Sequence, residues 1–449
     1  MTQVLEDKNA QLASFTSLAK PLASPLPWLE KLRRSGIARF GAVGFPSTKE
    51  EEWRFTNVAP IAQTAFKLGL REESAAAADL ASGYSIGREA AAEIVIVNGH
   101  FSASLSKLGK LPKGVTVTSL AEALKQTPAL VEAHLSRYAG IEKDAFVALN
   151  TGFLRDGAFV HFARGATVKQ PIHLLFVSVP SSEPWVAYPR VLMVAEDHVQ
   201  ATVVESYAGG GAGVYFNDAV TEIVLGENSF IDHCKLEQET LEAYHIAAMH
   251  VELGRASSFV SHAASIGGKL VRNDLSVALN GEGAEATLNG LVVIDGDQHV
   301  DNHTLLRHEK PNCPSHELYK NVLGGRASGV FKGKIYVQKD AQKTDAKQTN
   351  KTLLLSDDAT MNAMPALEIY ADDVKCTHGS TTGPVDEEMV FYLETRGVSH
   401  EAARHLLTYA FAADITRRIK VEAVRRRIED FMAAQHGLPQ DLRITDLGS

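Results

Sequence analysis

The segment Thr221–Ser229 reads T-E-I-V-L-G-E-N-S and joins a β-rich run to a turn of small and polar residues. Similar turns mark positions 165, 197, 226, 254, 281, 325 and 357, so the intervals are 32, 29, 28, 27, 44 and 32 residues. A repeat of roughly this length is typical of proteins built from stacked units. Strand-rich units of this kind predict a parallel β-solenoid, in which each rung buries its inward side chains against its neighbours. An ordinary β-sandwich with similar turns is the alternative.

The predicted solenoid spans residues 158–385 and follows an N-terminal region, residues 1–157, of mixed and partly helical character. Within that region Ser119 and Glu122 have the spacing of a capping box, which predicts the start of a helix. The small-residue stretch Ala75–Ala81 is expected to be a loop.

Residues 386–449 are predicted to form a C-terminal helical domain. Ser399 is a suitable N-cap for its first long helix. A second helix is predicted from apolar residues that recur at helical spacing, namely Val421, Val424, Ile428, Phe431 and Met432. The arginine and lysine residues around this stripe indicate either a solvated face or a module that docks a partner. The predicted fold class is therefore mainly β, with helical regions on both sides of the solenoid.

The strongest candidate for a functional site is Ala371–Gly379, which reads A-D-D-V-K-C-T-H-G. The preceding Leu367–Tyr370 is predicted to be a strand and the following Gly379–Pro384 a turn, so this segment would lie where the chain leaves a sheet. In an extended strand, residues i and i+2 point to the same face. Cys376 and His378 would therefore face one partner together.

The 44-residue interval is expected to hold an insertion with its own character. The insertion, Asp301–His308 followed by Cys313–Lys320, carries three histidines, His303, His308 and His316, together with Cys313. Such a group of side chains suggests metal binding. The alternative is that they satisfy buried turn carbonyls, or stack between neighbouring rungs, without any ligand.

Composition and motifs argue against several classes of function. The chain has 449 residues and a formal net charge of −9, which does not favour nucleic acid as a partner. Its three cysteines are odd in number and argue against a disulfide framework. Neither a membrane-spanning run nor a signal peptide is recognisable, so a cytoplasmic protein is predicted. There is no G-x-x-x-x-G-K-[ST], G-x-S-x-G or H-E-x-x-H motif.

The segment from Gln342 to Asp414 resembles the SufB/SufD family of iron–sulfur cluster assembly proteins. The stretches that carry the resemblance are Lys343–Ala346, Gln348–Asn350, Pro365–Ile369, Asp372–Gly379, Phe391–Leu393, Arg396–Gly397 and Ala410–Ala412. Upstream, Glu52–Thr56 is also similar to the family, and Asp301–Lys320 is similar to its SufD branch. The low number of cysteines favours that branch as well, since SufB-like chains carry extra cysteines that accept and move sulfur.

The resemblance implies a right-handed parallel β-helix core flanked by helical N-terminal and C-terminal regions. It further implies a non-catalytic scaffold subunit of a SufB–SufC–SufD-type complex for iron–sulfur cluster assembly. The implied partners are a SufB-like homologue, bound through the β-helix, and a SufC-like ABC-type ATPase, bound through the C-terminal helices. The isolated chain could instead form a homodimer.

By the same resemblance His378 would face a cysteine of the SufB-like partner, and Cys376 is a second candidate metal ligand. A neutral imidazole and a thiolate are suitable ligands for iron. Divided between two chains, they would hold transient iron or a nascent cluster, and no tightly bound cofactor is expected. The alternatives are that His378 only hydrogen-bonds at the interface and that Cys376 is a small packed apolar residue.

A function of a different class is a β-solenoid enzyme that acts on carbohydrate. Such enzymes commonly line a groove with paired carboxylates, which Asp372 and Asp373 could mimic. Adjacent residues of a strand face opposite sides, however, and the missing signal peptide counts against an extracellular enzyme. The scaffold hypothesis is therefore preferred.

Overall fold

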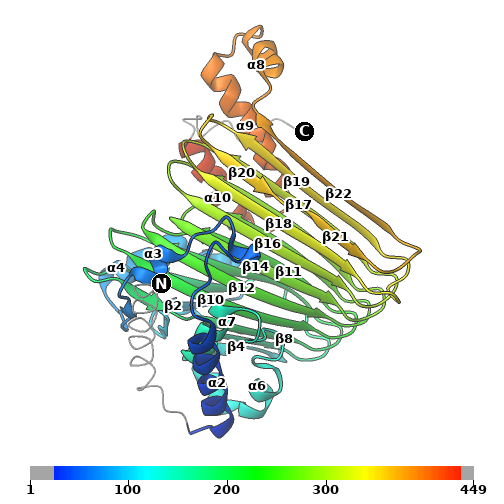
Figure 1. Ribbon diagram of the computed structural model, residues 1–449. Coiled ribbons are helices and arrows are strands. Elements are labelled where there is room, and N and C mark those ends of the chain that lie inside the picture. The colour runs from blue at the N-terminus through cyan, green and yellow to red at the C-terminus, as the bar shows by residue number, and fades with distance from the viewer. Residues whose placement is uncertain (1–24, 436–449) are drawn as a thin grey trace.

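The computed structural model describes residues 25–435, whose strands form two large sheets (Figure 1). Sheet A has 12 strands and sheet B has 10. Each rung contributes one strand to each sheet, and the successive core strands within a sheet are parallel. This arrangement confirms the predicted parallel β-helix and rules out the β-sandwich.

Sheet A follows the path β20-β18-β16-β14-β12-β10-β8-β5-β4, with β1, β7 and β21 beside it. Its strands are β1 (Lys67–Leu68), β4 (Val115–Ser119), β5 (Gly157–Phe162), β7 (Trp185–Ala187), β8 (Arg190–Ala195), β10 (Tyr215–Leu225), β12 (Ala243–Leu253), β14 (Leu270–Leu279), β16 (His299–His308), β18 (Ser328–Val337), β20 (Thr360–Ala363) and β21 (Ala366–Ile369). Sheet B follows the path β22-β19-β17-β15-β13-β11-β9-β6-β2-β3. Its strands are β2 (Ala92–Val97), β3 (His100–Phe101), β6 (Ile172–Ser178), β9 (Gln200–Gly209), β11 (Phe230–Gln238), β13 (Ser258–Ser265), β15 (Glu285–Ile294), β17 (Pro314–Leu323), β19 (Asp345–Leu354) and β22 (Lys375–Pro384).

Ladders of aliphatic side chains fill much of the space between the two sheets. In sheet A the register partners on five successive strands are Ile223, Val251, Val277, Leu306 and Ile335. None of these side chains is more than 1% exposed. Burial of apolar surface stabilises a fold by about 25 cal/mol per Å². Each rung therefore gains its stability from contact with the rungs on either side.

The predicted insertion is an ordinary rung made of β16 and β17. β16 is in register with β14 and β18, and β17 with β15 and β19. The turns at positions 165 to 281 lead from sheet A to sheet B, whereas those at 325 and 357 lead from sheet B to sheet A. The interval of 44 residues thus spans about one and a half regular rungs. The prediction is wrong because similar turns occur at both edges of the solenoid.

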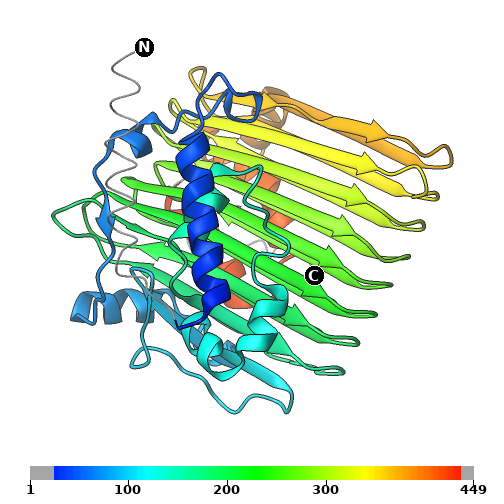
Figure 2. The same ribbon diagram turned by 60° about the horizontal axis from the view of Figure 1, so that its bottom comes forward.

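Helices cover the outer faces of both sheets, and Figure 2 shows α2 lying across the strands. The helical elements are α2 (Pro27–Val43), η1 (Glu51–Trp53), α3 (Ala59–Gln63), α4 (Ala75–Tyr84), η2 (Gly87–Glu89), α5 (Leu120–Gln126), α6 (Pro128–His134), α7 (Ala145–Gly152), α8 (Glu387–Glu394), α9 (His400–Thr416) and α10 (Glu422–Gln435). Trp53 and Phe216 belong to a cluster that packs the N-terminal region onto sheet A. Ile428 and Leu236 belong to one that packs α9 and α10 onto sheet B. None of the helices within residues 25–435 is long and apolar enough to cross a membrane.

The local predictions have mixed outcomes. The Ser119 hydroxyl accepts the N–H of Glu122 at 3.1 Å, and the Ser399 hydroxyl caps α9, so both predicted helix starts are confirmed. Ala75–Ala81 is not a loop but the first part of α4, since alanine has the highest helix propensity. Gly379–Pro384 is not a turn but continues β22, because β19 offers it a row of backbone partners.

The terminal regions are continuous with the solenoid. Residues before 157 contribute β1, β2, β3 and β4 to the two sheets, and β22 ends at Pro384, shortly before α8 begins. Residues 1–24 and 436–449 of the predicted flanking regions lie outside the described residues. The same is true of the N-terminal residues for which the sequence predicts no signal peptide.

A buried ion pair fastens the N-terminal region to sheet A. Arg190 of β8 and Glu222 of β10 are both fully buried, with 2.6 Å between Nη2 and Oε1. Glu222 also accepts the backbone N–H groups of Ser136, Tyr138 and Ala139, in the segment after α6. Because both charges are removed from water, losing one leaves the other uncompensated.

We expect Arg190→Met to lower the free energy of unfolding by about 3–5 kcal/mol, because Glu222 would stay buried without its counter-charge. Chemical denaturation followed by circular dichroism measures the change. Arg326→Met is the matched control, since Arg326 pairs with Asp297 at 2.8 Å on the exposed surface. Equal losses in the two variants would contradict the prediction.

Candidate functional site

The last strand of the solenoid, β22, forms one edge of sheet B. Within the part of the chain that the structure describes, its partner strand is β19 alone, in a parallel register over Lys375–Pro384. β22 lies at the outer edge of the stacked strands in Figure 1. One row of its backbone N–H and C=O groups is therefore open to a further strand.

Cys376 and His378 lie on the inward face of this edge strand. Their register partners in β19 are Ala346 and Gln348, which are 0% and 1% exposed. No further rung of the described residues covers β22, so His378 is exposed, whereas Cys376 is half-buried against the interior cluster. The structure thus places the two predicted residues on one face, at the open end of the solenoid. The His378 side chain makes no hydrogen bond or ion pair to any residue between 25 and 435.

The protonation of Cys376 follows from its partial burial. Burial raises the pKa of the thiol, and a backbone hydrogen bond involving Ala346 opposes this only in part. The side chain is therefore a neutral thiol at physiological pH in this chain by itself. A metal ion would have to displace its proton, because the thiolate is the ligand form.

Amide, hydroxyl and carboxyl groups line the interior beneath the candidate pair. Gln348 Nε2 donates a hydrogen bond to Glu317 Oε2 at 2.7 Å. Asn321 Nδ2 donates to Asn350 Oδ1 at 2.9 Å, and Asn350 Nδ2 donates to Ser380 Oγ at 3.3 Å. Burial raises the pKa of Glu317 to about 7. The solenoid interior is therefore polar at its open end.

A second polar cluster lies deeper in the interior and was not found by reasoning from the sequence. Lys235 Nζ lies 2.7 Å from Glu237 Oε1, and His245 bridges Glu237 and Glu239 at 3.1 and 2.7 Å. Burial opposes charge on His245, but Glu239 and Glu237 outweigh it and raise the pKa of the imidazole. Two carboxylates are thus balanced by an ammonium and an imidazolium. The sequence does show charged residues alternating with apolar residues along β11, which could have indicated this cluster. The same alternation is typical of a solvent-facing strand, so it does not distinguish the two.

The exposed apolar residues of α8 form a patch, defined by Met389, Phe391 and Tyr392. These residues are 46%, 67% and 52% exposed. Val390 of the same helix is buried, in a small cluster with Val385 and residues of α9. Figure 1 shows α8 projecting beyond the two sheets. The patch is therefore presented on a protruding helix and lies apart from the solenoid interior.

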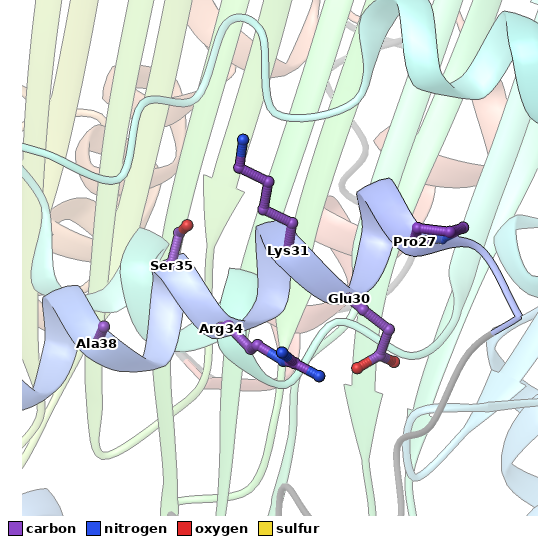
Figure 3. Close-up of a pocket in the computed structure, with 6 residues that line it drawn as sticks. All are labelled: Pro27, Glu30, Lys31, Arg34, Ser35 and Ala38. Carbon is purple, nitrogen blue, oxygen red and sulfur yellow. The ribbon is translucent and has the colours of Figure 1, made fainter.

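A hollow of about 530 Å³ lies against α2, far along the chain from β22. The residues that line it are Pro27, Glu30, Lys31, Arg34, Ser35 and Ala38. Figure 3 shows Lys31 and Ser35 pointing to one side of the helix and Glu30 and Arg34 to the other. Because these polar groups diverge, they do not form a site that could position a reacting group.

Comparison with known proteins agrees with the fold and the edge-strand motif. The model of the SufBD core domain of the SUF iron–sulfur cluster assembly system matches residues 178–411, and that of the SufBD N-terminal region matches residues 15–174. The chain belongs to the SufBD family. Among its relatives is an iron–sulfur cluster assembly SufBD family protein of Synechocystis, 31% identical over 415 residues, which cover 90% of each chain. The SufD proteins of Escherichia coli and Bacillus subtilis are 28% and 25% identical, over 86% and 89% of this chain and 88% and 92% of their own lengths.

The histidines of the rung β16–β17 do not converge on a metal in this SufBD-family chain. His308 Nε2 lies 3.0 Å from Ser315 Oγ, and burial lowers the pKa of His308 to about 4. His316 is exposed, and His303 lies in an ion cluster on the outer face of sheet A. The described residues contain no group of three or more histidine, cysteine, aspartate or glutamate side chains that could hold a metal ion. The structure therefore favours the interpretation without a ligand.

The ion cluster around His303 anchors the family-like segment Glu52–Thr56 to sheet A. The Arg272 guanidinium lies 3.8 Å from the centre of the Trp53 ring, and its Nη1 donates to Asp301 Oδ2 at 2.8 Å. His303 Nε2 lies 3.0 Å from Asp301 Oδ1, and its Nδ1 lies 3.4 Å from Glu52 Oε2. Although burial opposes it, these carboxylates raise the pKa of His303 to about 9. The segment Glu52–Thr56, which is similar to the family, thus serves to hold the N-terminal region on sheet A.

We expect the stability of the protein to fall between about pH 6.5 and 9, because His303 binds its proton more tightly in the folded state. Its contribution is complete below its unfolded pKa and is lost as the pH rises through its folded pKa. A shift from 6.5 to about 9 corresponds to up to about 3 kcal/mol. His303→Gln should therefore be less stable than the parent near neutral pH and should match it at high pH. Denaturation across this pH range measures the free energy of unfolding of the parent and the variant, with a substitution of the exposed His316, His316→Gln, as control. If the difference in free energy of unfolding between His303→Gln and the parent does not change with pH, the prediction is contradicted.

Proposed function

We propose that this protein is a non-catalytic scaffold subunit of a SufB–SufC–SufD-type complex, in which iron–sulfur clusters are assembled. The observation that carries the proposal is the exposed His378 beside the half-buried Cys376, on the inward face of an edge strand that pairs only with β19 among the described residues. In a complex, a SufB-like homologue pairs with the β22 end of the solenoid. The site then lies between the two chains, and the family membership supports this assignment.

Such a site holds a metal only weakly from one side. His378 offers an imidazole nitrogen, and Cys376 offers a thiol that must first lose its proton. Two such groups leave iron with an incomplete ligand set, so the partner chain supplies the rest. Transient iron or a nascent cluster held in this way is released when the two chains separate, which suits a scaffold that transfers its product.

The patch on α8 is the proposed docking surface for a SufC-like ABC-type ATPase. Aromatic residues and methionine are enriched in protein interfaces, and Phe391 and Tyr392 are more than half exposed here. The C-terminal helices also pack directly on sheet B, so movement of a bound ATPase would act on the sheet that carries β22. The carbohydrate-enzyme alternative is not favoured, since the family relationship points to cluster assembly.

We expect His378→Ala to leave folding and complex formation unchanged but to lower the yield of assembled cluster by at least about tenfold, because one ligand of the shared site is lost. Absorbance and iron and sulfide analysis of the reconstituted complex measure the yield. His316→Ala, which removes another exposed histidine of sheet B, is the matched control. Normal cluster yield from the His378 variant would refute the ligand role.

We expect Phe391→Ala combined with Met389→Ala to weaken capture of the SufC-like ATPase by at least about tenfold, since apolar anchors commonly dominate an interface. Pull-down with purified ATPase gives the apparent affinity. Leu241→Ala is the control, because Leu241 is 66% exposed in the turn between β11 and β12. Comparable losses in both variants would place the docking surface elsewhere.

A further inference from the structure

We propose that Gln348 is a positioning residue for His378: the imidazole, which makes no side-chain hydrogen bond within residues 25–435, turns over the carboxamide so that the Gln348 oxygen accepts its N–H, and Glu317 holds the carboxamide in that orientation. The inference rests on the proposed role of His378. It concerns residues one and two rungs behind the site, which neither face the partner nor touch the cluster. Their effect is on the direction of the imidazole and on which of its nitrogens carries the proton.

The three side chains form one column on the inward face of sheet B. Glu317 of β17 is the register partner of Gln348 in β19, and Gln348 is the register partner of His378 in β22. Neighbouring strands of a sheet are about 4.8 Å apart, so each side chain lies directly over the next. Only the last member of the column is on the surface, since Glu317 and Gln348 are 3% and 1% exposed whereas His378 is exposed.

Gln348 is left with one unused hydrogen-bonding group. Its Nε2 donates to Glu317 Oε2 at 2.7 Å, whereas its Oε1 is buried and has no partner among residues 25–435. The nitrogen and oxygen of a carboxamide point in diverging directions, so an amide that donates toward β17 turns its oxygen away from β17. Buried acceptors are nearly always satisfied in folded proteins. The Gln348 oxygen thus lacks a donor on the side from which His378 approaches.

Gly333, on the facing strand β18, fixes the place of this amide. A methyl group at residue 333 would overlap the Gln348 amide nitrogen, so the absence of a side chain there makes room for the carboxamide. The adjacent column shows that an amide of β19 can reach a side chain of β22. In that column Asn350 Nδ2 donates to Ser380 Oγ at 3.3 Å.

A hydrogen bond from His378 to Gln348 has a defined chemical consequence. A neutral imidazole has one N–H and one bare nitrogen, and the group that accepts the N–H decides which nitrogen is bare. With Gln348 as acceptor, the other nitrogen of His378 faces away from the solenoid, as a metal ligand must. Metal-binding histidines generally have such an acceptor behind them.

The test is the ¹⁵N spectrum of the histidine rings in the isolated full-length protein, recorded where imidazoles are neutral. His378→Ala identifies the signals of His378. In the parent we expect two well-separated ring-nitrogen resonances for His378, as for a single tautomer. In Gln348→Met we expect both resonances to move toward a common average, as for two tautomers in exchange. Gly333→Ala, which displaces the amide without changing its chemistry, should have the same effect. Combining Glu317→Gln with Gln348→Glu keeps an acceptor next to His378 and should restore the separation.

Asn350→Leu is the matched control, because it removes an amide from the same strand and face but from the adjacent column. If Gln348→Met leaves the His378 signals unchanged, or Asn350→Leu moves them equally, the positioning role is overturned. The measurement needs neither iron nor a partner chain. The two hypotheses can therefore fail separately. If Gln348 controls the tautomer of His378 but the His378→Ala variant still assembles clusters, the positioning role is supported and the proposed function is overturned.

Discussion

A strand of a parallel solenoid satisfies its backbone only through the strands on both sides of it, and this constraint determines where the molecule can interact. Inside the stack, the aliphatic ladder from Ile223 to Ile335 and the parallel register close every rung against the next. At the N-terminal end the short antiparallel strands β3 and β4 are added to the sheets, and helices pack beside them. At the other end β22 follows β19, and residues 25–435 supply no further strand beyond it. The open end is thus a consequence of the stacking itself.

The outer helices allow the interior to be polar in places. α9 and α10 cover part of sheet B with an apolar cluster, so the strand segments beneath them are buried on both faces. Lys235, Glu237 and His245 can therefore lie inside the solenoid, because their charges balance one another and apolar burial is supplied elsewhere. A buried ion cluster of this kind contributes little net stability, although removal of one member is costly. In this part of sheet B, the outer face thus supplies apolar burial where the inner face carries polar groups.

The sequence predicted the solenoid because its turns recur, and it predicted the common face of Cys376 and His378 because strand geometry alternates. It does not show at which edge of the solenoid each turn lies, because the turns at the two edges look alike. The sequence therefore predicts an insertion where the structure has an ordinary rung. It also failed at Gly379–Pro384, where the backbone partners offered by β19 outweigh the low strand propensity of glycine and proline. Gln348 and Glu317 escape prediction because alternation does not show which face of a strand is inside, and a polar residue is expected on the outer face.

The composition of β22 itself argues that its open edge is used. Free-standing edge strands are commonly protected by charged residues, by proline within the strand or by a bulge, since an exposed row of backbone groups otherwise binds other chains. Between Lys375 and Pro384 this strand reads C-T-H-G-S-T-T-G, with no residue that is charged when histidine is neutral. Small hydroxyl-bearing and glycine residues are inexpensive to remove from water when their backbone finds a partner strand. Between its end residues the edge thus combines an open hydrogen-bonding row, an uncharged stretch and the two proposed ligands, Cys376 and His378. A surface that only needed protection from solvent would have no reason to bring these features together.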